Sequence, residues 1–101
     1  MANTIRPLIE EAVKVSMRER NKEKTSTLRM AISELKKEEI DTRKDITDEV
    51  SIKILQRMIK QRKESMSQFN EAGRDELAKK EELEIKILEE FMPQQLGENE
   101  I

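Results

Sequence analysis

The chain has 101 residues, of which 42% are charged and 2% are aromatic, and its formal net charge is −2. A chain of this length forms one domain or part of one. Because Cys and His are both absent, disulfides, thiolate nucleophiles, Ser–His relays and the usual zinc ligand sets are excluded. No uncharged run exceeds seven residues, which excludes a membrane span and a secretory signal. We therefore expect a cytoplasmic protein that needs no cofactor or metal and does not bind membranes.

The first helix is predicted from Thr4 to Arg20. Apolar residues follow helical spacing from Ile5 to Met17, Thr4 is the expected N-cap, and Pro7 lies in the first turn, where proline is tolerated.

Two further helices are predicted on either side of a polar connector at residues 41–45. The second helix follows a short break at residues 21–22 and ends near Ile40. Its apolar stripe consists of Leu28, Ala31, Ile32 and Leu35. Thr47, followed by two acidic residues, is a typical helix start and opens a long third helix that reaches about Ala72.

A fourth helix completes the predicted fold. Gly73 is the expected left-handed cap of the third helix, and the fourth runs from Asp75 to Met92, where Pro93 stops it. β-branched residues never alternate over four positions, so no strand is predicted. The sequence thus predicts an all-α protein with four amphipathic helices in an antiparallel helical-hairpin or bundle arrangement, the third helix being long.

Positive charge is unevenly distributed along the chain. The net charge is +2 for residues 1–46, +2 for residues 47–74 and −6 for residues 75–101. In an up-and-down arrangement, the turn between the first and second helices lies at the same end of the bundle as the turn between the third and fourth. We call this end the pole. The candidate RNA-binding cations at or near this pole are Arg18, Arg20, Lys22, Lys24 and Arg74, with Lys60 and Lys63 extending it. The alternative interpretation is that these cations are ordinary solvent-exposed residues on helix surfaces and bind no RNA.

Arg62 has a different predicted role. On a helical wheel it falls in the middle of the apolar arc of the third helix, while Glu81 and Glu84 fall on that of the fourth. Counting outward from Gly73 places Arg62 opposite residue 84 or 85. We therefore expect a structural ion pair between Arg62 and Glu84, with Glu81 as the alternative partner.

The remaining residues predict no catalytic site. Carboxylate pairs such as Glu38 and Glu39 are neighbours in sequence and diverge on a helix, so no acid and base flank a substrate. Five methionines fall mostly on apolar arcs, where core packing is favoured over a flexible binding groove. These are Met17, Met30, Met58, Met66 and Met92.

Three segments carry a resemblance to a known family. These segments are KQRKES at 60–65, AGRDELAKKEELEIKILEEFMPQQL at 72–96 and TLRMAISELKKEEI at 27–40. They resemble the YqeY family (GatB/YqeY), whose members are free-standing relatives of the tail domain of the tRNA-dependent amidotransferase B subunit. The sequence departs from the family at 91–93, where Phe-Met-Pro stands in place of an aromatic residue, Leu and Pro.

The resemblance implies a helical N-terminal domain at 1–93, with 94–101 as a linker and the start of a truncated or missing C-terminal helical domain. It also implies contact with tRNA, and association with an amidotransferase or aminoacyl-tRNA synthetase assembly. A carbon–nitrogen ligase activity with glutamine as amido donor would be implied only through that larger enzyme, because the residues of this chain predict no independent catalysis.

Two functions follow as hypotheses. The first is an accessory module that binds structured RNA through the basic pole, in a salt-sensitive manner. The second is a protein-interaction or scaffold domain without nucleic-acid binding, which uses an exposed apolar surface or the acidic face of the fourth helix. The acidic residues expected on that face are Glu82, Glu89 and Glu90.

Overall fold

The structure is a computed structural model that describes residues 4–93. It contains four helices: α1 (Ile5–Arg18), α2 (Lys22–Thr42), α3 (Asp48–Glu71) and α4 (Asp75–Glu89). The described part of the chain has no strand, and α3 is the longest helix with 24 residues. The predicted all-α fold with a long third helix is therefore confirmed. The expected linker at 94–101 lies outside the described residues.

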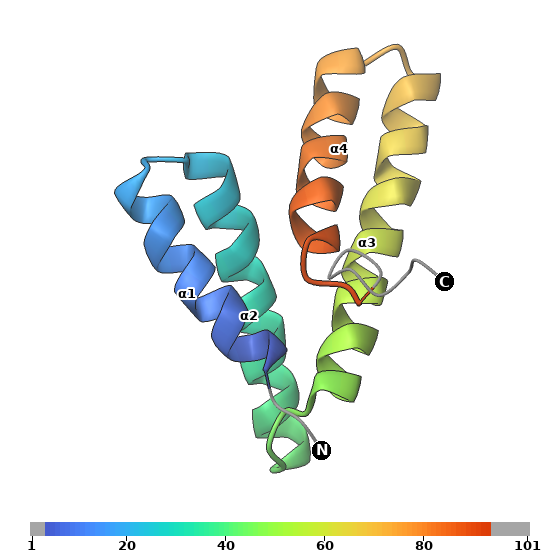
Figure 1. Cartoon of the computed structure of the whole chain (residues 1–101). Coiled ribbons are helices and arrows are strands. Elements are labelled where there is room, and N and C mark those ends of the chain that lie inside the picture. Colours follow the sequence, from blue (N-terminus) through green and yellow to red (C-terminus); the bar gives the residue numbers. More distant parts are fainter. Residues whose placement is uncertain (1–3, 94–101) are drawn as a thin grey trace, which may run out of the picture.

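The helices form two antiparallel hairpins that diverge like the arms of a V (Figure 1). One hairpin consists of α1 and α2, the other of α3 and α4, and the turn from α2 to α3 lies at the narrow end. Contacts between helices are densest within each hairpin, and α2 also contacts both helices of the second hairpin. The arms diverge toward the α1–α2 turn in the view of Figure 1, and α2 is the helix of the first hairpin that contacts both α3 and α4.

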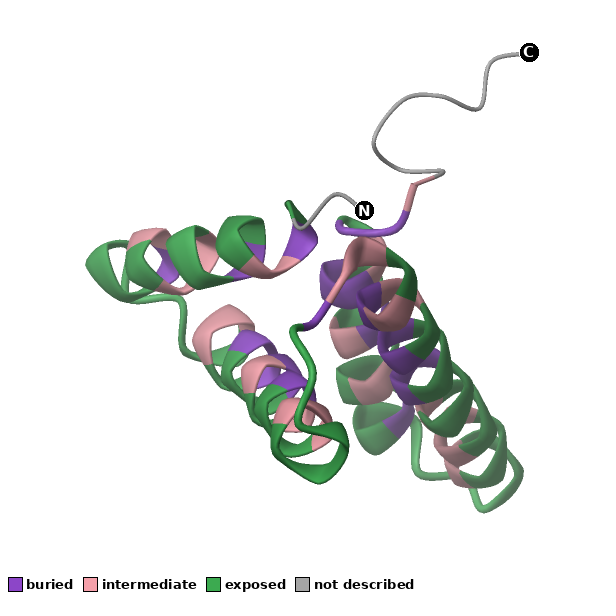
Figure 2. Cartoon of the chain, turned by 90° about the horizontal axis from the view of Figure 1, so that it is seen from below, coloured by how far each residue is buried: buried purple, intermediate pink, exposed green. Residues whose placement is uncertain are grey.

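A core of aliphatic side chains holds the hairpins together. Figure 2 shows that buried positions lie on the sides of the helices that face a neighbouring helix. The largest fully buried apolar side chains are Ile9, Leu28, Leu35, Ile46, Leu55 and Leu88. Each such side chain contributes about 1.5–3 kcal/mol through removal from water. Phe91 and Met92 are also buried and extend the core beyond the end of α4.

Helix ends differ slightly from the sequence prediction. α2 continues past Ile40 to Thr42, and its C-cap is Arg43, a non-glycine residue at φ 57°. α4 ends three residues before Met92, because the last amides turn back to nearer carbonyls ahead of Pro93. Gly73 has φ 73° and ends α3 as predicted.

The N-termini of α1 and α3 meet at one carboxylate. Thr4 is the N-cap of α1, but its side chain does not accept a cap hydrogen bond. Instead, the backbone N–H groups of Thr4 and Ile5 donate to Asp48 Oδ1 at 2.7 and 2.8 Å, and Thr4 Oγ1 donates to Asp48 Oδ2 at 2.8 Å. Asp48, at the first position of α3, therefore supplies the cap that α1 lacks.

Ser51 carries a buried hydroxyl without a partner. Its side chain is fully buried in α3, and Oγ makes no hydrogen bond within the described residues. Replacing Ser51 with Ala removes this unpaired polar group and increases helix propensity, so we expect the free energy of unfolding to rise by about 1 kcal/mol. Urea unfolding of the two proteins measures this difference, and a destabilised S51A would show that the hydroxyl has a partner in solution.

Candidate nucleic-acid interface

A tightly hydrogen-bonded turn joins α1 to α2 at the open end of the V. Asn21 caps α2 by accepting a hydrogen bond from the Lys24 N–H at 3.1 Å, and its own N–H donates to the Ser16 carbonyl at 2.9 Å. The hydroxyls of Ser16 and Thr25 lie 2.6 Å apart and link the two helices just below the turn. The backbone of this turn is therefore held by hydrogen bonds to both helices.

Arg20 occupies a strained position in this turn. Its φ is 59°, in the left-handed region that glycine adopts without penalty. An L-residue with a Cβ is disfavoured there by roughly 1 kcal/mol. Two hydrogen bonds close the end of α1 around this residue, from the Arg20 N–H to the Met17 carbonyl at 3.1 Å and from the Asn21 N–H to the Ser16 carbonyl at 2.9 Å, and they offset part of this cost. Unfavourable backbone conformations of this kind cluster at functional sites.

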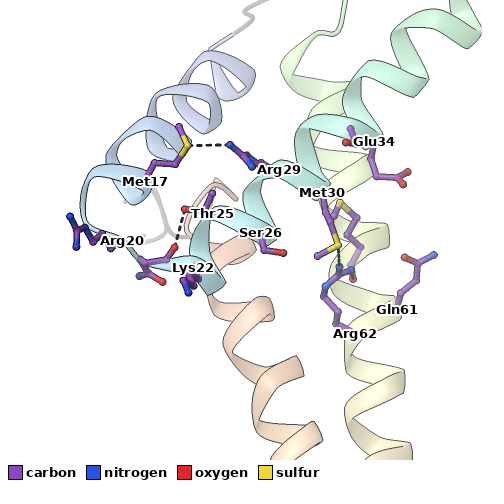
Figure 3. A pocket seen from close by; sticks show the side chains of 13 residues that line it. Met17, Arg20, Lys22, Thr25, Ser26, Arg29, Met30, Glu34, Gln61 and Arg62 are labelled. Atoms are coloured by element: carbon purple, nitrogen blue, oxygen red, sulfur yellow. Dashed lines mark hydrogen bonds between the residues drawn. The ribbon is translucent and has the colours of Figure 1, made fainter.

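A groove of about 760 Å³ lies beside this turn, between the first half of α2 and the middle of α3 (Figure 3). Met17, Met30 and Met58 supply its apolar lining. Four cations and one anion are also among the 13 lining residues, which gives the lining a net charge of +3 in a chain whose net charge is −2. These charged residues are Arg20, Lys22, Arg29, Arg62 and Glu34.

Three of the four cations are free to bind an anion. Among residues 4–93, no carboxylate lies within ion-pair distance of Arg20, Lys22 or Arg29. Arg29 Nη2 donates to Met17 Sδ at 3.1 Å, and a thioether is a weak acceptor that leaves most of the guanidinium donors available. The single anion, Glu34, is held by Arg57 Nη2 at 3.0 Å. We name Arg20, Lys22 and Arg29 the groove rim.

The fourth cation, Arg62, forms the ion pair expected from the sequence. Its Nε donates to Glu84 Oε1 at 2.8 Å, and both side chains are only 13% exposed. Nη1 donates to the Met58 carbonyl at 3.2 Å, and Nη2 approaches Met30 Sδ at 3.6 Å. Arg62 therefore joins α3 to α4 and touches α2, and it is not available to a ligand as a free charge.

Glu81 lies close to this pair without replacing Glu84. Burial raises the pKa of Glu81, the nearby Glu84 carboxylate raises it further, and the charges of Arg62 and Lys80 offset only part of the rise. The Arg62–Glu84 pair therefore joins α3 to α4, and Glu81 is influenced by both of these charges.

The remaining RNA-binding candidates do not join the groove rim. Lys24 pairs with Glu90 at 3.5 Å, so the start of α2 lies against the end of α4. Arg74, at the start of α4, is therefore separated from Lys24 by the 15 residues of that helix, about 22 Å. The expected single pole is divided because the hairpins are staggered along their lengths. Arg18 is exposed at the end of α1, next to the turn.

Lys60 and Lys63 point away from the groove. Both are exposed on α3, where Met58, Gln61 and Arg62 line the groove. At 100° per residue, the two lysines lie roughly 150° from the centre of that lining arc. They do not extend the basic surface in the manner the sequence suggested.

The sequence interpretation missed three features of the groove. Arg29 was not among the candidate cations, although it shares a helix face with Lys22, seven residues earlier. Met17 and Met30 were assigned to the core, yet they are 45% and 37% exposed and line the groove. Met58, Met66 and Met92 are buried or packed against the core as predicted.

The described residues contain no group of three or more side chains suited to hold a metal ion. Within the same part of the chain, no helix is long and apolar enough to cross a membrane.

Comparison with known proteins identifies the family. The chain is 37% identical to an uncharacterized protein of Schizosaccharomyces pombe over 79 residues, which cover 78% of this chain and 64% of that protein. It is 33% and 31% identical to the proteins of Kluyveromyces lactis and Eremothecium gossypii named altered inheritance of mitochondria protein 41, mitochondrial. These matches cover 82% and 83% of this chain but 45% and 46% of the relatives.

The chain thus spans between 45% and 64% of the length of the curated relatives it matches. A family model described as Yqey-like protein matches residues 6–101, nearly the whole chain. The protein therefore belongs to the Yqey-like family.

Proposed function

We propose that this protein is a non-catalytic accessory module that binds structured RNA, tRNA being the first candidate, through the groove rim. The observation that carries the proposal is the set of three cations without an ion-pair partner that line one groove, Arg20 in the α1–α2 turn and Lys22 and Arg29 in the first half of α2, in a net acidic chain. Cations placed in this way attract phosphates and release counterions, which supplies affinity without sequence readout.

The target is expected to be folded RNA. The chain has two aromatic residues, and Phe91 is buried while Phe69 is half-buried, so neither offers an aromatic face for a series of stacked bases. Binding must then rely on phosphates and on the shape of a stem. Association with an amidotransferase or synthetase assembly, and the cytoplasmic location expected from the sequence, belong to the same proposal.

A double variant tests the groove rim. In R20G/K22Q, the loss of two cations should weaken tRNA binding at least tenfold at moderate salt and reduce the slope of log K against log salt by roughly 2. Fluorescence anisotropy with labelled tRNA at several salt concentrations measures both quantities. The thermal midpoint should not fall, because glycine relieves the left-handed backbone at position 20.

The chain offers a matched control at the other end of α2. Arg43 is the other non-glycine residue with positive φ among residues 4–93, and it is followed by Lys44. R43G/K44Q therefore makes the same changes in charge and backbone about 30 Å away. This control should bind tRNA as the wild type does. Equal losses in the two variants would mean that net charge, and not the groove rim, determines binding.

The protein-interaction hypothesis has less support from the acidic face of α4. Glu82 pairs with Lys86 at 3.9 Å, and Glu90 pairs with Lys24, so two of its three expected acidic residues already have partners. Association that is insensitive to salt, with no tRNA binding by the wild type, would favour this second function.

A further inference from the structure

We infer that the groove receives an unpaired nucleotide of the bound RNA, next to the stem whose phosphates contact the groove rim. This inference rests on the proposed function and specifies the RNA more closely: a stem that ends in, or is interrupted by, a base without a partner. Four properties of the groove support it, namely its lining, its polar groups, the spacing of its cations and its size.

The apolar lining is exposed and adaptable. Met17 reaches into the groove from α1 and Met30 from α2 (Figure 3), and they are 45% and 37% exposed. Each thioether touches an arginine, Met17 through Arg29 and Met30 through Arg62. A methionine side chain is flexible and polarizable, so it can pack against the flat face of a base without an aromatic ring.

Uncharged polar groups accompany the methionines. Ser26, Ser33 and Gln61 line the groove, and all three are exposed. Their hydroxyl and amide groups both donate and accept hydrogen bonds, as the edge of an unpaired base requires. A groove that bound only phosphate would need donors alone.

The cations are spaced for a nucleotide strand. Lys22 and Arg29 are seven residues apart on α2, about 10 Å along the helix axis. Phosphates of one stacked strand recur about every 3.4 Å along its axis, so this span covers several of them. A strand that leaves its stem along α2 would keep its phosphates on the groove rim while one base turns inward.

The size of the groove favours a nucleotide over a docked helix. Its volume of about 760 Å³ is within the range of small-ligand sites. An amphipathic helix binds through a continuous apolar stripe of several turns. The groove exposes only Met17 and Met30 for this purpose, because Met58 is 3% exposed. The net charge of +3 in the lining also complements a phosphate-bearing ligand.

Two RNA hairpins with equal numbers of phosphates test the inference. One has a blunt stem, and the other has a shorter stem with a single-stranded 3′ overhang that carries 2-aminopurine. Wild-type protein should bind the overhang hairpin about fivefold more tightly and change the 2-aminopurine fluorescence. M17A should lose this preference while it still binds the blunt hairpin. L8A is the matched control, because Leu8 is an exposed apolar residue of α1, 48% accessible, that does not line the groove.

The outcomes separate the inference from the proposed function. Equal affinity of the wild-type protein for the two hairpins, both salt-dependent and weakened by R20G/K22Q, would overturn the inference and leave the proposed function intact. No binding of either hairpin at low salt would overturn both. Loss of the preference in L8A as well as in M17A would assign it to general apolar surface and would also overturn the inference.

Discussion

Replacing Arg62 with Ala should lower the thermal midpoint by roughly 10 °C, which corresponds to about 2 kcal/mol for a chain of this size. The substitution leaves Glu84 with no partner in a seam where its side chain is 13% exposed, and it also removes the hydrogen bond to the Met58 carbonyl. The loss is expected to be smaller than the 3–5 kcal/mol typical of a fully buried pair, since water reaches the remaining carboxylate. Thermal unfolding followed by circular dichroism measures the change.

Lys63 is the natural control for this prediction. It is the next residue on α3, is exposed and has no carboxylate within ion-pair distance among residues 4–93, so K63A should leave the midpoint within about 2 °C.

The destabilisation of R62A should also decrease as the pH is lowered toward 4. Removal of Arg62 takes away one of the charges that oppose the raised pKa of Glu81, so protonation of that carboxyl favours the folded variant. Equal, small effects of R62A and K63A on the thermal midpoint would contradict the structural role of the Arg62–Glu84 pair.

The second large effect is expected at the narrow end of the V. Replacing Asp48 with Ala should reduce the free energy of unfolding by about 2 kcal/mol, because three hydrogen bonds from Thr4 and Ile5 are lost together and α1 loses its cap. Urea unfolding measures the reduction. E49A is the matched control, since Glu49 is also an acidic residue in the first turn of α3 but is exposed. It removes the favourable interaction with the helix dipole alone, worth about 0.5 kcal/mol.

The contribution of Asp48 should depend on pH in a defined direction. Burial tends to raise the pKa of this carboxyl, but the hydrogen bonds from Ile5 and Thr4 outweigh burial and lower the pKa below 3.8. A carboxyl whose pKa is lower in the folded state stabilises the fold above its unfolded pKa and loses this effect as the pH falls through the folded value. The difference between wild type and D48A should therefore be constant from neutral pH to about 5 and decrease below about 4. A difference that stays constant down to pH 2 would indicate that the carboxylate charge is not involved.

Features that depend on neighbouring parts of the chain could be predicted from the sequence. Gly73 defines a tight turn, and helical periodicity then determines which residues of α3 and α4 face each other. The Arg62–Glu84 pair could be deduced in this way because only about ten residues on each side separate it from the turn. The same local signals identified the start of α3 at Thr47, whose hydroxyl accepts a hydrogen bond from the Val50 N–H at 3.3 Å.

Features that depend on how the hairpins meet could not be predicted. Arg74 and Lys24 were expected to share a pole, but the angle and stagger of two hairpins arise from packing between distant segments, which periodicity does not report. Met17 was assigned to the core for the same reason: its helix face is apolar, yet the diverging arms leave that face uncovered near the turn. Asp48 carries a local signal for α3, and nothing in the sequence indicates that its carboxylate caps α1.

The division into two hairpins has a consequence for folding kinetics. The two most extensive helix contacts, α1 with α2 and α3 with α4, join helices that are adjacent in sequence. Forming such contacts closes only a short loop, so the loss of chain entropy is small. A topology rich in such local contacts is typical of fast-folding helical proteins. The hydrogen bond from Thr4 to Asp48 joins residues 44 positions apart, so we expect it to form later than the local contacts within each hairpin.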